Sequence, residues 1–539
     1  MLLPDSTDYA TLRSEFRWTI PDTFNIAAVV CDDWASRAPD QVALVHVQAD
    51  GSSVPVTYVQ LQRAANKLAN LLVASGIQPS DRVAILLPQT PETAIAHIAI
   101  YKIGAVALPL ADLFGVEALE YRFNNSGAKA LITSHASLGK IAEIRSAVPG
   151  LEHIWSIDGP GDGAAGLHEA MERAQDTFQT VNSAPDDPAL MIYTSGTTGP
   201  PKGALHGHRV LAGHLPGIQF GHDFFPQPGD RIWTPADWAW AGGLLNVLLP
   251  GLFFGVPVIG HRFEKFEPDR AFSLMAEHQV RNTFVPPTAL KMMRAVPNPA
   301  SKYDLKIRTL FSGGEAVGRE LQDWAVEEFG QSINEIYGQT ECNLVLETCV
   351  PAGIYRKGAI GKPVPGHEVA IVDDTGNPLP PGEAGAIAVR RPDPVMFLEY
   401  WGQPEATRDK YIGDWLITGD QGICDEDGYF YFVGRDDDVI TSAGYRIGPG
   451  EIEDCLIGHP AVKLAAAVGK PDELRTEIVK AFIVLNDGFE GSEALETEIR
   501  TYVRERLAAH EYPREIAFED DLPLTTTGKV IRRLLREKA

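Results

Sequence analysis

Residues 194–203, with the sequence TSGTTGPPKG, combine hydroxyl side chains, glycines and one lysine in a short segment. They follow an apolar run at 189–193 that is typical of a buried strand. Glycines let backbone N–H groups approach an anion closely, the hydroxyls add donors, and Lys202 adds a positive charge. The segment predicts a polyphosphate-binding loop, although such clusters also occur in ordinary turns. The candidate ligands are Thr194, Ser195, Gly196, Thr197, Thr198, Gly199 and Lys202.

This loop does not have the Walker pattern. That pattern is GxxxxGK followed by Ser or Thr. Lys202 follows Pro201 and precedes Gly203, and the pair Gly528-Lys529 is followed by Val530. A phosphate loop outside the Walker class must be identified by other motifs in the chain.

Length and composition limit the class of protein. A chain of 539 residues is too long for one compact core, so we expect two or more domains. The net charge of −25 argues against nucleic acid or an anionic membrane as a partner. The chain has no apolar run of about 18 residues, and its first residues do not resemble a signal peptide. Its five scattered cysteines lack CxxC spacing, which favours a reduced, cytoplasmic protein without a structural metal.

The first third of the chain alternates helix and strand signals. Thr57 and Gln60 form a capping box before a helical pattern that Gly76 ends. Strands are expected at 83–87, 130–133 and 153–157, and a second helix at 91–103. This alternation predicts an α/β fold with doubly wound parallel sheets.

The pattern changes in the second half. Short strand signals separated by turns predict a small antiparallel β-barrel between about residues 345 and 430. A shorter α+β pattern then begins after the polar run at 434–438. We therefore expect a large N-terminal domain over 1–434, a connection at 435–438, and a small C-terminal α+β domain over 439–539.

Five further motifs accompany the loop: SGGEA (312–316), YGQTE (337–341), TGD (418–420), GRDDDVITSAGYRIGPGEIE (434–453) and LPLTTTGK (522–529). Their order closely resembles that of the AMP-forming acyl-CoA synthetases, most of all the short- and medium-chain members, from about residue 25 to the C-terminus. The resemblance implies that a carboxylic acid reacts with ATP to give an acyl-adenylate and pyrophosphate. Coenzyme A (CoA) then displaces AMP to form a thioester.

The resemblance also implies roles for individual residues. Lys529 would bridge the acyl carboxylate and the α-phosphate, with Thr340 and Glu341 also in the catalytic set. Glu341 and Thr194 would lie at a Mg²⁺ ion, which prefers oxygen ligands. Besides the loop, the nucleotide would contact Gly314, Glu315, Ala316, Glu335, Tyr337, Gly338, Gln339, Thr340, Asp420 and Arg435. Without the motifs around them, most of these residues would be interpreted as ordinary solvent-exposed side chains or turn residues.

A hinge and a CoA site follow from the same resemblance. Asp437 stands at the family's hinge position, about which the C-terminal domain would rotate between adenylation and thioester formation. The residues implied for CoA are Ala443, Gly444, Tyr445, Arg446, Arg475 and Arg504. Without the resemblance, Arg475 and Arg504 would be interpreted as surface residues that form salt bridges.

The acid is less constrained. Acetate-specific relatives carry Trp at the position of Gly338, so we expect Gly338 to leave the acyl pocket open. Trp240 would form one wall, or be an ordinary core residue. A short- to medium-chain acid, including branched acids, is favoured.

Other functions stay open. They are an aryl- or alicyclic-carboxylate CoA ligase, an adenylation enzyme that loads a carrier protein, and a nucleotide-binding regulator without turnover. Arg475 argues against an enzyme that loads a carrier protein. The joint presence of Lys529, Glu341 and Asp420 argues against a regulator without turnover. The expected partners are the acid, ATP and CoA. Many members of the family form homo-oligomers, but no sequence feature identifies an interface.

Overall fold

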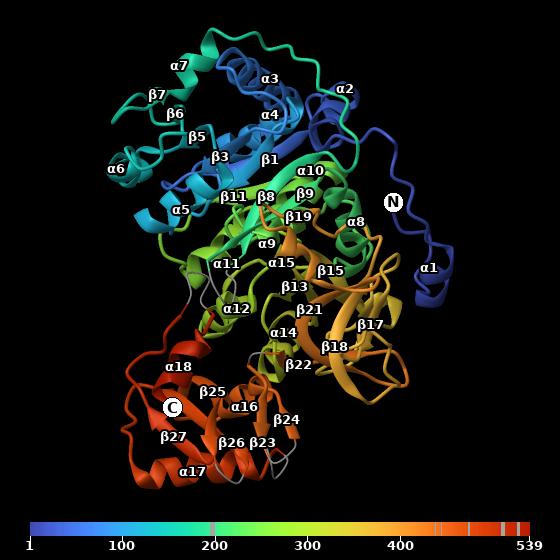
Figure 1. Ribbon diagram of the computed structural model, residues 1–539, viewed down its shortest axis with the longest axis vertical. Helices are drawn as coiled ribbons and strands as arrows, with labels where there is room; N and C mark the ends of the chain where they lie inside the picture. The colour runs from blue at the N-terminus through green and yellow to red at the C-terminus, as the bar shows by residue number, and fades with distance from the viewer. Residues whose placement is uncertain (195–199, 437, 443–444, 473–474, 508–511, 525–528) are drawn as a thin grey trace.

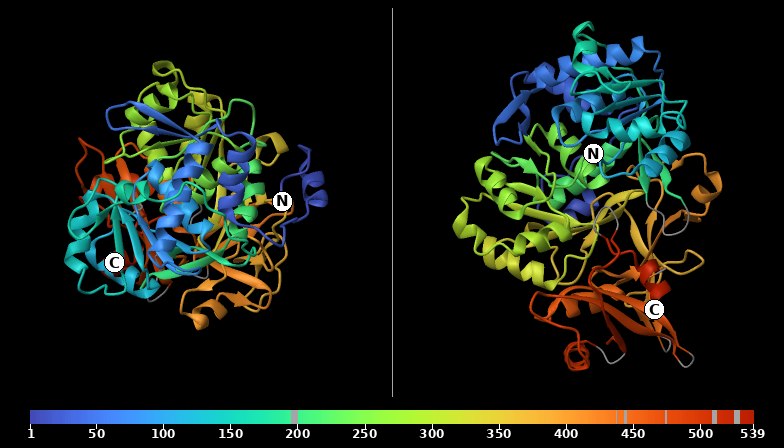
Figure 2. Two further views of the ribbon diagram at one scale, coloured as in Figure 1. Left: turned by 90° about the horizontal axis from the view of Figure 1, so that it is seen from above. Right: turned by 90° about the vertical axis from the view of Figure 1, so that its left-hand side faces the viewer.

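The computed structural model describes residues 1–194, 200–436, 438–442, 445–472, 475–507, 512–524 and 529–539, with backbone only at 441, 445, 446 and 451. Among these residues the strands form four sheets, three before residue 436 and one after residue 439. The C-terminal sheet and its helices form a lobe below the N-terminal sheets in Figure 1, and the right-hand view of Figure 2 shows the same separation.

The first sheet has nine strands, of which the central six are parallel. In spatial order the strands are β16 (Lys362–Pro363), β15 (Cys342–Glu347), β14 (Ile333–Gln339), β13 (Thr309–Gly313), β12 (Asn282–Phe284), β10 (Ile232–Trp233), β11 (Val258–His261), β1 (Val42–Val47) and β2 (Ser53–Thr57). The helices of this part include α8 (Arg209–Gly221), α9 (Ala241–Gly243), α10 (Leu249–Phe254), α11 (Pro268–Glu277), α12 (Pro287–Arg294), α13 (Pro299–Lys302) and α14 (Arg319–Phe329).

The second sheet has eight strands, which are parallel except for β9; β9 runs antiparallel to both of its neighbours, β8 and β19. In spatial order they are β19 (Glu399–Tyr400), β9 (Lys202–Gly207), β8 (Pro188–Thr194), β4 (Val106–Pro109), β3 (Arg82–Leu86), β5 (Ala130–Thr133), β6 (His153–Ser156) and β7 (Ala165–Gly166). Its helices are α3 (Tyr58–Ala74), α4 (Pro91–Lys102), α5 (Val116–Ser126), α6 (His135–Ile144) and α7 (Leu167–Glu172).

One apolar core joins the two large sheets. It contains residues of β1 and β11 from the first sheet, of β3 and β5 from the second, and of α3 and α4. Thr57 and Gln60 form the expected capping box at the start of α3. Every residue of α4 from Thr93 to Lys102 is buried, because α4 packs within this shared core. The buried Lys102 ammonium is compensated by an ion pair with Asp32 at 2.5 Å.

The remaining sheets are smaller. The third, of five antiparallel strands, takes the place of the expected barrel: β17 (Val369–Val372), β18 (Ala384–Arg390), β21 (Trp415–Cys424), β20 (Tyr411–Ile412) and β22 (Phe430–Arg435), with α15 (Pro404–Arg408) beside it. The fourth contains β24 (Tyr445–Ile447), β23 (Ile440–Ser442), β26 (Thr476–Leu485), β25 (Val462–Asp472) and β27 (Glu515–Phe518), with α16 (Pro449–Ile457), α17 (Glu493–Arg504) and α18 (Arg532–Lys538). A short helix, α1 (Tyr9–Glu15), lies near the N-terminus.

The predicted fold class is confirmed. Two large, mostly parallel sheets with helices, a small antiparallel sheet and a small α+β C-terminal unit follow one another along the chain. All five cysteines are free thiols, in agreement with their spacing. In the part of the chain that the structure describes, no helix has the length and apolar character needed to cross a membrane.

Candidate nucleotide and acyl site

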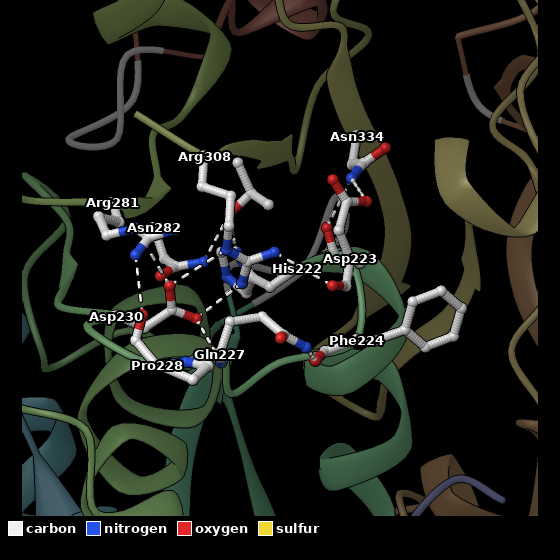
Figure 3. Close-up of polar contacts among 12 residues, drawn as sticks. His222, Asp223, Phe224, Gln227, Pro228, Asp230, Arg281, Asn282, Arg308 and Asn334 are labelled. Carbon is white, nitrogen blue, oxygen red and sulfur yellow. Dashed lines mark hydrogen bonds and ion pairs between the residues drawn. The ribbon is translucent and has the colours of Figure 1, made fainter. Parts of the chain in front are cut away.

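Strand β14 carries four of the candidate nucleotide residues, Glu335, Tyr337, Gly338 and Gln339, and a polar cluster lies where the strand begins (Figure 3). Asn334 Nδ2 donates to the carbonyl of Gly221, at the end of α8, at 2.8 Å and to Asp223 Oδ1 at 2.9 Å. Beside them Arg308 binds the buried Asp230 carboxylate through two nitrogens, at 2.7 and 3.1 Å. These bonds tie the beginnings of β13 and β14 to the chain after α8.

Three predicted residues meet around the carboxylate of a fourth, Asp420. Asp420 Oδ2 accepts from the Tyr337 hydroxyl at 2.7 Å and from Gln339 Nε2 at 2.9 Å. Arg435 lies 3.2 Å from Asp420 Oδ1, since β21 and β22 pair these two residues directly. Burial raises the pKa of Asp420, while Arg435 and the two donors oppose that shift. The motifs YGQTE, TGD and GRDDD therefore form one polar cluster.

A second cluster joins the phosphate loop to the turn after β14. Glu341 lies in that turn, and its Oε1 accepts a hydrogen bond from the Tyr400 hydroxyl. Lys202 Nζ lies 5.0 Å from the centroid of the Tyr400 ring. Thr194 and Lys202 are paired across β8 and β9, at the base of the loop. The other predicted loop ligands, residues 195–199, lie outside the described residues.

The loop after β13 contains the predicted residues Gly314, Glu315 and Ala316. Gly314 has a φ of +92°, which favours glycine, and Glu315 Oε2 accepts from Thr288 Oγ1 at 3.1 Å. Glu335 is buried, and its Oε1 accepts from the backbone N–H of Val317 at 3.3 Å. Burial raises the pKa of Glu335 to about 7. Glu335 therefore holds this loop against β14.

The surroundings of Gly338 differ from the expected open space. A Cβ at this position would lie 2.4 Å from the backbone nitrogen of Leu344 and 2.7 Å from Asn343 Cα. These atoms belong to β15, which folds back onto β14 with an irregular register at this point. The glycine is required by the close approach of two backbones, and that side of it offers no room for an acyl chain.

The segment around Trp240 is fixed between the two large sheets. Gln89 Nε2, after β3, donates to the carbonyls of Thr234 at 3.1 Å and Ala236 at 2.6 Å. Gln89 Oε1 accepts from the N–H of His261, the last residue of β11, at 3.2 Å. Trp240 is half-buried and meets the Phe114 ring edge-on at a centroid distance of 5.8 Å. The role of Trp240 in a pocket wall stays a prediction.

The residues predicted in the C-terminal unit are more dispersed. Lys529 lies three residues before α18, whose side of the lobe faces the N-terminal sheets in Figures 1 and 2. Arg475 lies just before β26, and Arg504 is exposed at the end of α17, on the far side of the lobe (Figure 1). Tyr445 and Arg446 are on β24, with backbone only described. Asp437, Ala443 and Gly444 lie outside the described residues.

Sequence reasoning missed two residues that organise the site, Tyr400 and Gln89. Tyr400 precedes Trp401 and Gly402 in a segment without distinctive spacing, and Gln89 follows a strand as a common loop residue. Only the pairing of β19 with β9 places Tyr400 beside Lys202. The one available signal for Gln89 was its place three residues after the end of a buried strand.

Comparisons with known proteins find relatives over almost the whole chain. The sequence model of the family described as AMP-binding enzyme matches residues 31–401, and that of the AMP-binding enzyme C-terminal domain matches residues 451–529. The chain is 36% identical to the acetyl-coenzyme A synthetase of Bacillus subtilis, over 89% of this chain and 84% of that protein. It is 33% identical to the mitochondrial acyl-coenzyme A synthetase ACSM3 of Mus musculus, over 99% of this chain and 93% of that protein.

A solved structure supports the same grouping. The anthranilate CoA ligase AuaEII, in complex with anthranoyl-AMP, superposes with a TM-score of 0.88 at 30% identity. The match covers 96% of this chain and 98% of that chain. The similarity therefore includes both the N-terminal sheets and the C-terminal unit.

Proposed function

We propose that this chain, which belongs to the AMP-binding enzyme family and is an AMP-forming acyl-CoA synthetase, activates a short- to medium-chain or branched acid. The enzyme joins a carboxylic acid to CoA with ATP, through an acyl-adenylate. One observation supports the proposed function best: predicted site residues from several motifs come together at β14 and the turn after it. Tyr337, Gln339 and Glu341 lie within five positions, and they meet Asp420 on one side and Tyr400 with Lys202 on the other.

In the first step an oxygen of the acid forms a bond to the α-phosphorus of ATP, and the bond to pyrophosphate breaks. Two anions must approach each other, so positive charge and donors are needed at both. Lys202 and the loop would hold the leaving phosphates, and Lys529 would bridge the carboxylate and the α-phosphate. Asp420 would accept from the ribose hydroxyls, with Tyr337 against the adenine.

Glu341 fits a place beside Mg²⁺. It is a buried carboxylate in the turn between β14 and β15, with one oxygen bound to Tyr400. Among the described residues no three His, Cys, Asp or Glu side chains could together hold a metal ion. A single carboxylate suits Mg²⁺, which keeps waters and takes the substrate's phosphates as its other ligands. The ion would supply charge neutralisation of the departing pyrophosphate.

In the second step the thiol sulfur of CoA bonds to the acyl carbon and AMP leaves. A hinge at 435–438, with Asp437 as its pivot, would replace Lys529 by the segment 443–446 at the site. Domains over 1–434 and 439–539 are consistent with the separation of the fourth sheet from the other three. Arg475 would contact a CoA phosphate, and the far position of Arg504 makes it the weaker member of this set.

The acid class is supported by the rigid segment at Trp240, where Phe114 and Trp240 form an aromatic corner. An aryl acid is the second candidate, because the anthranilate CoA ligase AuaEII is similar over nearly the whole chain. The free thiols and acidic composition favour a cytoplasmic location.

The test is AMP formation by the purified protein with ATP and Mg²⁺. The acids are acetate, butyrate, isobutyrate, hexanoate, octanoate and benzoate, each with and without CoA, and Lys529→Ala is the inactive control. Strongest CoA-dependent turnover with butyrate, isobutyrate, hexanoate or octanoate is the expected result. Preference for benzoate would favour the aryl ligase, and preference for acetate would refute the acid class. Pyrophosphate exchange without CoA-stimulated AMP release would refute CoA as the acceptor.

A further inference from the structure

Arg532, the first residue of α18, lies three positions after Lys529 and joins two carboxylates. Its guanidinium contacts Glu453 Oε2 at 2.7 Å and Oε1 at 3.2 Å, and Asp438 Oδ2 at 3.3 Å. All three side chains are largely buried, with 21% of Arg532, 14% of Asp438 and 13% of Glu453 exposed. Solvent therefore screens this cluster weakly, and a planar guanidinium bound to two acids has one preferred position.

The two carboxylates come from different parts of the C-terminal unit. Asp438 directly follows the proposed pivot, and it also pairs with Arg536, one turn further along α18, at 3.0 Å. Glu453 lies on α16, and its Oε1 also accepts from the backbone N–H of Ala467 on β25 at 2.8 Å. The cluster thus links the beginning of the unit, α16 and the sheet to the segment that follows Lys529.

Other contacts hold the residues on both sides of Lys529. Leu524 and Val530 form an isolated bridge, and the N–H of Ile531 donates to the carbonyl of Pro523 at 2.8 Å. Leu522 and Leu535 are buried in one apolar cluster with residues of β25 and β26. These contacts attach residues 522–524 and 530–535 to the sheet, and Arg532 joins Asp438, the residue next to the pivot. The start of α18 lies on the side of the lobe that faces the N-terminal sheets (Figures 1 and 2).

We propose that Arg532 is a positioning residue for the adenylation step. By joining Asp438 to Glu453, it sets where Lys529 lies relative to the pivot and therefore relative to the α-phosphate. The inference rests on the proposed function, in which Lys529 acts during acyl-adenylate formation and leaves the site before CoA reacts. Arg532 itself contacts neither substrate. Loss of its bonds then slows the first half-reaction and spares the second.

The experiment measures the two half-reactions separately. Acid-dependent exchange of pyrophosphate into ATP reports the first, and CoA-dependent release of AMP from supplied acyl-adenylate reports the second. Arg532→Gln should lower the exchange rate by about 10²-fold, the usual cost of misplacing a catalytic group by about 1 Å. The KM for ATP and the second half-reaction should stay unchanged. The exchange rate of Arg532→Lys should lie between those of the unsubstituted protein and Arg532→Gln, because an ammonium cannot bind two carboxylates in the forked geometry of a guanidinium.

Arg533→Gln is the matched control. Arg533 is the next residue of α18 and pairs only with Glu537 among the described contacts, at 2.5 Å on the exposed side. It should leave both half-reactions unchanged. Equal losses in both half-reactions for Arg532→Gln would show a merely structural role and overturn the inference, as would no loss in either.

Two further checks keep the outcomes separate. If Arg532→Gln does not fold, as judged by thermal unfolding, Arg532→Lys and Asp438→Asn must show the same selective loss, or the inference fails. If the unsubstituted protein shows no exchange with any acid, the proposed function fails and this role for Arg532 fails with it. If the unsubstituted protein catalyses the exchange but the variants lower both half-reactions alike, only the role of Arg532 is refuted.

Discussion

Replacing Tyr400 with Phe removes one hydroxyl between the phosphate loop and Glu341. The Tyr400 hydroxyl donates to Glu341 Oε1, and both side chains are buried, at 3% and 7% exposure. The ring, over which Lys202 Nζ lies at 5.0 Å, is retained in the variant. Burial, with Glu341 nearby, raises the pKa of Tyr400, so the phenol remains a donor at every pH of interest. The change therefore isolates a single charge-assisted hydrogen bond.

The expected loss follows from that bond. A hydrogen bond to a charged group contributes about 1.5–3 kcal/mol, and each 1.36 kcal/mol of transition-state stabilisation is tenfold in rate. If Glu341 must be held in place as pyrophosphate departs, kcat/KM for ATP falls by about 10- to 150-fold. The Mg²⁺ concentration for half-maximal rate should rise as well, since the carboxylate is less well oriented. Both are measured as AMP release with the best acid over a Mg²⁺ series.

Tyr431→Phe is the matched control, because the Tyr431 hydroxyl also donates to a carboxylate, Asp425 Oδ2, at 3.1 Å, outside the site. It should change neither the rate nor the Mg²⁺ dependence. A Tyr400→Phe enzyme that behaves like Tyr431→Phe at low and high Mg²⁺ would refute the role given to this hydrogen bond.

Three other changes have defined outcomes. Gly338→Ala should destabilise the protein by about 1–3 kcal/mol in urea unfolding and lower turnover of every acid alike, because its Cβ meets the backbone at Leu344; a stable variant with shifted acid preference would contradict this. Glu335 has its pKa raised from 4.5 to about 7, so its uncharged form is favoured in the fold. Stability should fall by about 3 kcal/mol as the pH rises through that window, and Glu335→Gln should lack this fall in unfolding measured from about pH 4 to pH 8. Asp420→Ala should raise the KM for ATP by about 10- to 100-fold, since it removes a charged acceptor beside Arg435; an unchanged KM would exclude Asp420 from the ribose site.

Local sequence carried enough information for the fold class and the order of the motifs. Alternating helix and strand patterns, the capping box at Thr57 and the glycine-rich loop each depend on neighbouring residues, and such signals survive without any tertiary contact. The grouping of Tyr337, Gln339 and Asp420 could also be anticipated, because their motifs occur in a recognisable order.

Tertiary structure decided what touches these residues. Tyr400 reaches Glu341 because β19 pairs with β9, and Arg532 reaches Asp438 because α18 folds back over the beginning of its own unit. Gly338 was expected to open a pocket, but the return of β15 places backbone against it. The physical reason is the same in each case. A residue type records what a side chain can do, whereas strand order and packing determine which distant partner it meets.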